Sequence, residues 1–187
     1  MGDAITYEEF GVNFITLAIT PGRVGKAVRE AAGESITIDP LKAGPGNVAD
    51  VEATGRIGEP RVRRVGDTPL QMHADLPVDL ALSIRLAGST HRMKARLEVP
   101  LRLTIRVEEP LFVVADVEEI DPGEVSVRVA ARGVAAKVLQ RVGNVEEEIR
   151  RRVAPVINEI VSSERALAAR VIDILPLIQR AWPEDDG

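Results

Sequence analysis

Two histidines and one run of carboxylates are the residues that could most readily hold a metal ion. His73 and His91 belong to no HxH, HxxxH or HExxH pattern, the spacings that bring two imidazoles to one zinc ion. Both are predicted to be exposed polar residues. The acidic run over residues 116–121 offers oxygens to calcium, but not with the spacing of an EF-hand loop. We therefore predict no metal site, and the run is better interpreted as a solvated strand end.

The sequence also lacks the motifs that are typical of covalent catalysis and of nucleotide binding. The chain has no cysteine, which excludes thiolate metal sites, disulfides and cysteine nucleophiles. It contains no GxSxG, no P-loop and no GxGxxG after a strand. Gly22 and Gly25 flank a helix start that could bind an anion, although small residues near a packing contact explain them more simply. The sequence thus predicts neither a catalytic constellation nor a cofactor.

The amino-acid composition argues against some classes of binding partner. The 187 residues carry a net charge of −5 and only 3% aromatic residues, so neither phosphate attraction nor base stacking favours nucleic-acid binding. No apolar run reaches the roughly 18 residues of a membrane span, and the first residues show no secretory signal. The expected location is the cytoplasm, with peripheral attachment to a membrane as an alternative.

A basic stripe is predicted on the polar face of one strand. Such a stripe can meet the headgroups of an anionic membrane surface, or it can pair with acids such as Asp79, Asp116 and Glu118 or with acids of a partner. The candidate membrane-facing residues are Arg92, Lys94, Arg96, Arg102 and Arg106.

The strongest pattern is a period of two between residues 69 and 132. Every second residue is apolar from Leu76 to Leu86 and again from Met93 to Val107, which predicts two long strands with one buried face and a turn at Gly88-Ser89. Pro100 suggests an edge position or a local bend. Further strands are expected at 35–39, 51–57, 111–117 and 125–129, with a loop at 40–47.

Helices are expected at both ends. Residues 5–19 fit a helix or a strand, whereas Thr20-Pro21 begins a helix that ends at Gly33. From Val134 to Ile160 the apolar period changes to that of a helix. Gly143-Asn144 interrupts this stripe, with Asn144 predicted as a new N-cap partnered by Glu147. Pro155 predicts a kink, and one more amphipathic helix is expected from Ser162-Ser163 to Trp182.

These elements predict an α+β fold in a single domain, 1–187. A long curved antiparallel sheet, a meander over 35–132, would wrap a long helix from the C-terminal helices (134–182). An N-terminal helical segment (5–33) and a solvated tail (183–187) complete the domain.

A sheet wrapped around a helix can leave an apolar groove. The predicted function is binding of an apolar ligand there, such as a phospholipid or another acyl lipid, without catalysis. The alternative is a solid interior in an interaction module that forms a homodimer. The candidate lipid contacts are Phe10, Phe14, Leu80, Leu82, Ile84, Met93, Leu97, Leu101, Leu103, Val113, Ile149 and Val153.

A helical N-terminus, unusually long strands over 97–133 and a C-terminal Val/Ile stripe resemble the tubular lipid-binding (TULIP) superfamily, and the Arg-rich, Lys-poor composition is similar to that of its small actinobacterial members. The resemblance implies binding of an acyl lipid with no chemistry. The Bet v 1/START-like helix-grip fold is the rival resemblance, since it also closes a curved sheet with a C-terminal helix around apolar ligands.

Overall fold

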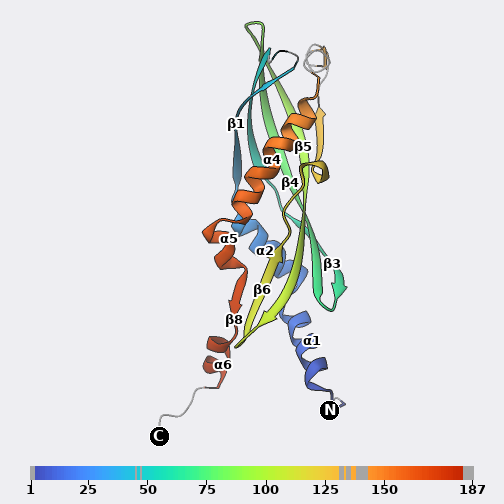
Figure 1. Cartoon of the computed structure of the whole chain (residues 1–187), viewed down its shortest axis with the longest axis vertical. Helices are drawn as coiled ribbons and strands as arrows, with labels where there is room; N and C mark the ends of the chain where they lie inside the picture. The colour runs from blue at the N-terminus through green and yellow to red at the C-terminus, as the bar shows by residue number, and fades with distance from the viewer. Residues whose placement is uncertain are drawn as a thin grey trace.

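We describe the chain from a computed structural model, which covers residues 3–44, 46, 48–130, 133, 136–137 and 143–182. A curved antiparallel sheet wraps around helices that lie on its concave side (Figure 1). The predicted α+β class, with a long sheet around a long C-terminal helix and a helical N-terminus, is confirmed.

Two long strands, β4 (Leu70–Leu86) and β5 (Ser89–Glu108), form the middle of the sheet and pair along their whole length. The two residues between them, Ala87 and Gly88, have φ of 49° and 78°. Two consecutive residues with positive φ make the hairpin turn whose twist matches that of the flanking strands. The turn therefore lies one residue before the predicted position.

β4 has two different outer partners. It pairs with β3 (Arg61–Asp67) over its first part, as far as Asp75, and with β2 (Ala49–Ile57) from Val78 onward. β1 (Ser35–Ala43) then pairs with β2 and forms one edge of the sheet.

β5 also changes partner midway. It pairs with β7 (Ser126–Ala130) over Lys94–Glu98 and with β6 (Phe112–Val117) over Leu103–Glu108. β8 (Val171–Asp173) pairs with β6. Since β6 and β7 both pair with β5, this part of the sheet is not the simple meander that was predicted.

A proline marks each place where a central strand changes partner. Pro77 lies between the β3-paired and β2-paired parts of β4, and Pro100 lies between the β7-paired and β6-paired parts of β5. A residue that pairs on one side only tolerates the missing N–H donor. We call this level the waist. The upper half carries β1, β2 and β7, and the lower half carries β3, β6 and β8.

The long helix α4 (Val145–Val161) lies across the concave face of the upper half (Figure 1). The side chains that it buries include Val145, Ile149, Val153 and Ile157, which join the inward residues of the sheet in one core. Pro155 lies within this helix. The earlier part of the predicted stripe, with Val134, Val138 and Val142, lies outside the described residues.

Asn144 is the N-cap residue of α4, as predicted, but the expected capping by its side chain is wrong. Asn144 has a left-handed backbone, with φ of 42°, and makes no side-chain cap hydrogen bond. A capping side chain reaches the first helical N–H groups from an extended N-cap residue, which this conformation is not. Glu147 instead forms ion pairs with Arg150 and Arg151.

At the N-terminus, α1 (Tyr7–Ala18) decides the helix-or-strand ambiguity in favour of a helix. Thr6 and Glu9 form a reciprocal capping box at its start. α2 (Pro21–Ala32) runs as predicted, from a Thr20 N-cap to Gly33 with φ of 77°.

Two predicted segments differ from the structure. β1 continues to Ala43 through part of the expected loop, with a register shift between Ile38 and Leu41, because an edge strand tolerates Pro40 at an irregularity. The expected single helix up to Trp182 is wrong, since α5 (Glu164–Ala169), β8 and α6 (Leu175–Ala181) follow one another. A short 3-10 turn (η2, Pro122–Glu124) precedes β7.

Gly55 tests the packing of the upper half. A Cβ added at this buried position in β2 would lie 2.6 Å from both Ile36 Cγ2 and Leu80 Cδ2, so Gly55→Ala is expected to lower the free energy of unfolding by about 1–3 kcal/mol. The matched control is Gly11→Ala, whose Cβ would meet open space on α1 and should raise helix stability by up to about 1 kcal/mol. Urea denaturation measures both, and a Gly55→Ala protein as stable as the parent would contradict this packing.

Candidate functional site

The upper half of the concave face is filled by α4. Side chains predicted to contact a ligand here keep at most 5% of their surface exposed, and they line neither of the apolar pockets described below. They belong to the packed core of the upper half. These residues are Leu80, Leu82, Ile84, Met93, Leu97, Ile149 and Val153.

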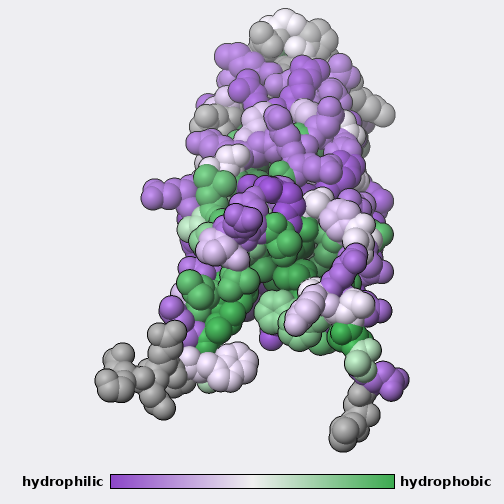
Figure 2. All heavy atoms as spheres, turned by 60° about the horizontal axis from the view of Figure 1, so that its bottom comes forward, coloured by the Kyte–Doolittle hydropathy of each residue, from purple (hydrophilic) through white to green (hydrophobic). Residues whose placement is uncertain are grey.

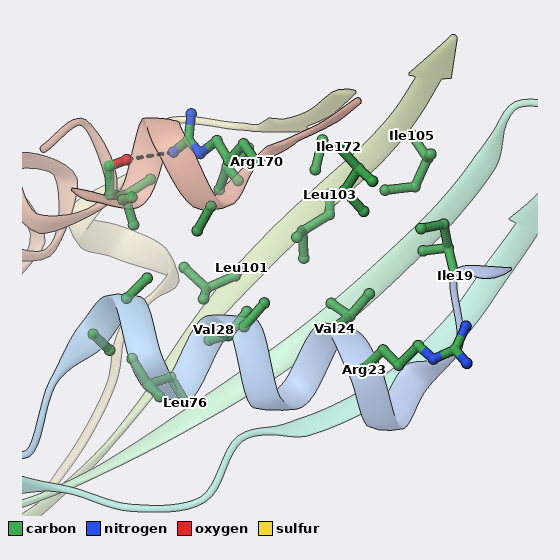
Figure 3. A pocket seen from close by; sticks show the side chains of 18 of the residues that line it. Ile19, Arg23, Val24, Val28, Leu76, Leu101, Leu103, Ile105, Arg170 and Ile172 are labelled. Atoms are coloured by element: carbon green, nitrogen blue, oxygen red, sulfur yellow. Dashed lines mark hydrogen bonds between the residues drawn. The ribbon is translucent and has the colours of Figure 1, made fainter. Parts of the chain in front are cut away.

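Below the waist, α2 and α5 leave a cavity of about 160 Å³ against the sheet, which we call the inner cavity (Figure 3). Val24 and Val28 of α2 face Leu101 and Leu103 of β5 across it. Several positions on the helices are alanine, which explains the space, because short side chains do not reach the opposite wall. The alanines that line the cavity from α2 and α5 are Ala27, Ala31, Ala32, Ala166 and Ala169.

The lower end of the molecule contains an open groove of about 1110 Å³. Its walls come from α1, the hairpin between β5 and β6, and α6, and Figure 2 shows the apolar surface hollowed between the two projecting ends. Phe10 and Phe14 line it and remain 60% and 40% exposed. Ile105 and Val113 line both the open groove and the inner cavity. One apolar wall therefore runs from the interior to the lower end.

Five of the twelve predicted lipid contacts line these two spaces. Phe10 and Phe14 lie in the open groove, Leu101 and Leu103 in the inner cavity, and Val113 in both. The α2 wall was predicted as a helix but not as part of a site. The sequence feature that could have identified this wall is the apolar stripe Val24, Ala27, Val28 and Ala31, whose side chains are small.

The lining of the inner cavity includes two charged residues. Arg23 donates through Nη1 to the Ala18 carbonyl, and Arg170 donates through Nη2 to the Val161 carbonyl, each at 2.6 Å. Partial burial lowers the pKa of Arg170, and nearby Asp116 opposes that shift. Both guanidinium groups thus bond to the backbone, and the lining holds no carboxylate or histidine that could exchange a proton with a ligand.

The side chains considered as metal ligands do not form a cluster in the described part of the chain. Within the described part of the chain no group of three or more His, Asp or Glu side chains could hold a metal ion. Both histidines are half-buried rather than exposed as predicted. His73 lies 3.3 Å through Nδ1 from Arg63 Nη2, while His91 pairs with Ile84 near the tip of the hairpin.

Three residues of the predicted basic stripe form ion pairs. Arg96 bonds Asp79 at 3.0 Å, and Arg102 contacts both Glu118 and Glu124. The resulting ion pairs use charge that would otherwise be available to lipid headgroups.

Arg106 completes this set by binding Asp116 through two nitrogens and Glu108 through a third. The remaining stripe residues, Arg92 and Lys94, are exposed. In the described ranges, no helix is both long enough and apolar enough to cross a bilayer.

Comparison with known proteins finds likeness in structure. No protein-family model matches the sequence, and no curated protein matches it. Among solved structures, the crystal structure of lipopolysaccharide binding protein is similar over 83% of this chain, with 11% sequence identity and a TM-score of 0.42. This chain spans 38% of the length of that protein.

Asp116 gives a prediction for pH. Hydrogen bonds from Arg106 hold the pKa of its carboxyl below the usual value, with desolvation acting in the opposite direction. Because the folded pKa is depressed, the stabilisation of the β5–β6 hairpin is present above the unfolded pKa of about 3.9 and is lost as pH falls through the folded value. Carboxyl ¹³C shifts followed against pH should show this low pKa.

Arg106→Gln should return the pKa of Asp116 toward its ordinary value. Arg96→Gln is the matched control, since Arg96 lies on the same strand but pairs with Asp79. An equal effect of the two substitutions on Asp116 would argue against the assigned pairing.

Proposed function

We propose that this protein binds an apolar ligand, a phospholipid or another acyl lipid, in the inner cavity and the open groove, and that it does no chemistry on it. The observation that carries the proposal is the continuous apolar wall through Ile105 and Val113, which lines both the inner cavity and the open groove. An acyl chain is long, thin and apolar, so its end fits the inner cavity while the rest lies in the groove.

The sizes of the two spaces support a ligand that is only partly enclosed. The inner cavity, at about 160 Å³, is too small for a whole lipid, whereas the open groove has about 1110 Å³; typical ligand pockets measure about 300–1,000 Å³. Val, Leu, Ile and Ala predominate in the inner lining. Such a surface stabilises a flexible chain through burial without demanding a particular polar pattern.

We further propose that the ligand site and the α4-covered core form one domain. β4 and β5 run through both halves, so their inward residues belong to the core above the waist and to the cavity wall below it. The packed upper half would then hold the strands in place while the lower half stays hollow.

Filling the inner cavity tests the proposal. Ala27→Phe places a ring among Val24, Val28 and Leu101, and it should weaken binding of a fluorescent fatty acid by roughly tenfold or more, about 1.4 kcal/mol or above. Ala168→Phe is the matched control, because Ala168 is exposed on α5 and lines neither space. Fluorescence titration measures both affinities, and thermal unfolding checks that both variants fold.

Mass spectrometry of organic extracts from the purified protein supplies an independent test. The expected result is a co-purified lipid that Ala27→Phe depletes and Ala168→Phe retains. A parent protein that carries no lipid and takes up no fluorescent fatty acid would overturn the proposed function.

A further inference from the structure

All aromatic side chains of the protein gather at one end. The sequence has three Phe, one Tyr and one Trp, and the core contains none of them. Phe10, Phe14, Phe112 and Trp182 line the open groove, and Tyr7 stands on α1 beside it. Tyr7 and Trp182 are 97% and 75% exposed. Because the core is aliphatic and the aromatic rings are exposed at one end, we expect this end to contact a partner that interacts well with aromatic rings.

The two helices at this end are held by few tertiary contacts. Neither α1 nor α6 has a buried residue. On α1, Phe10, Phe14 and Leu17 follow at i, i+4 and i+7, and the Phe10 and Phe14 rings stack with centroids 6.4 Å apart. On α6, Ile178 is followed by Trp182 one turn later. Short helices gain most of their stability from packing an apolar face. α1 packs on the core through Ile15 and Ala18, but the apolar residues named above stay exposed on both helices.

The placement of these helices defines a docking surface. α1 and α6 project from the lower end on either side of the β5–β6 hairpin (Figure 1). Val107 and Leu111 of this hairpin are exposed and line the same groove as the two helices. Figure 2 shows this end as the face where apolar residues reach the surface. An exposed apolar surface of this extent marks an interaction site. We name the set Tyr7, Phe10, Phe14, Val107, Leu111 and Trp182 the aromatic end.

The charged residues around the aromatic end indicate which kind of partner can bind there. In the described part of this end, acids outnumber arginines. Arg64 pairs with Asp67, and Arg106 pairs with Glu108 and Asp116. The acids that remain outside the ion pairs of the described residues are Glu8, Glu9, Glu109 and Asp173. A second copy placed face to face would bring two acid-rich surfaces together, and an anionic lipid surface would be repelled in the same way. The acids are Glu8, Glu9, Asp67, Glu108, Glu109 and Asp173, and the arginines are Arg64, Arg106 and Arg180.

We infer that the aromatic end docks onto the surface of a neutral, zwitterionic lipid bilayer. Tryptophan and tyrosine prefer the membrane–water interface, where the ring meets hydrocarbon and the polar atom meets water, and the amphipathic stripes of α1 and α6 suit the same depth. Docking in this way would place the mouth of the open groove against the bilayer. That consequence rests on the proposed function, whereas the docking itself does not.

The single tryptophan makes the test direct. Trp182 emission should shift to shorter wavelength when phosphatidylcholine vesicles are added, and brominated phosphatidylcholine should quench it. The double variant Phe10→Ser/Phe14→Ser should lower the partition coefficient by roughly tenfold or more. Val48→Ser/Leu167→Ser is the matched control, since these two exposed apolar residues lie away from the groove lining, and it should bind vesicles like the parent.

Several results would overturn the inference. An unshifted Trp182 with phosphatidylcholine, or equal partition of the two double variants, removes the aromatic end as the docking surface. Binding that requires phosphatidylserine and disappears at high salt assigns docking to basic residues instead. A blue-shifted Trp182 without vesicles, with a dimer in sedimentation, assigns the surface to a second copy. Fatty-acid uptake without vesicles is measured separately, so failure of docking and failure of lipid binding are distinguishable.

Discussion

The pairing of β4 with β5 is the interaction on which the rest of the structure depends. The register runs unbroken from Leu86↔Ser89 to Leu70↔Ile105, so each inward residue on one strand faces an inward residue on the other. Every outer strand except β1 and β8 pairs directly with one of these two. At the waist their partners change without a break in the central ladder. The upper and lower halves are therefore two different environments on one continuous apolar face.

The difference between the halves arises from what covers that face. Above the waist α4 brings Ile149 and Val153 against the sheet, and both are fully buried. Below it α2 brings a stripe rich in alanine, and the space remains partly empty. α1 and α6 then extend beyond the sheet without burying a residue. We propose ligand binding in the lower half because the helices there leave part of the apolar face of the sheet accessible.

The sequence allowed much of the sheet to be predicted but little of the site. The alternation from Leu76 to Ile105 identified the inward residues, because a period of two has a single structural interpretation, whereas Val107 at the end of the pattern is exposed. Nothing in that pattern separates Leu97, which is core, from Leu101, which lines the cavity, since the distinction depends on where α4 and α2 lie.

The C-terminal region did carry a local signal. Pro176 lies in the first turn of α6, where its missing N–H costs no intrahelical hydrogen bond. It therefore marks a fresh helix start within the predicted helix.

The continuous β4–β5 ladder also has a consequence for the order of folding. The pairs span sequence separations from 3 residues at Leu86↔Ser89 (89 − 86) to 35 at Leu70↔Ile105 (105 − 70), and each successive pair enlarges the loop only slightly. Loop-closure entropy rises slowly in such a series, and the Ala87-Gly88 turn closes the first step. The hairpin can therefore zip from its tip as a sequence-local unit, and we expect it to form the template on which the outer strands and then α4 assemble.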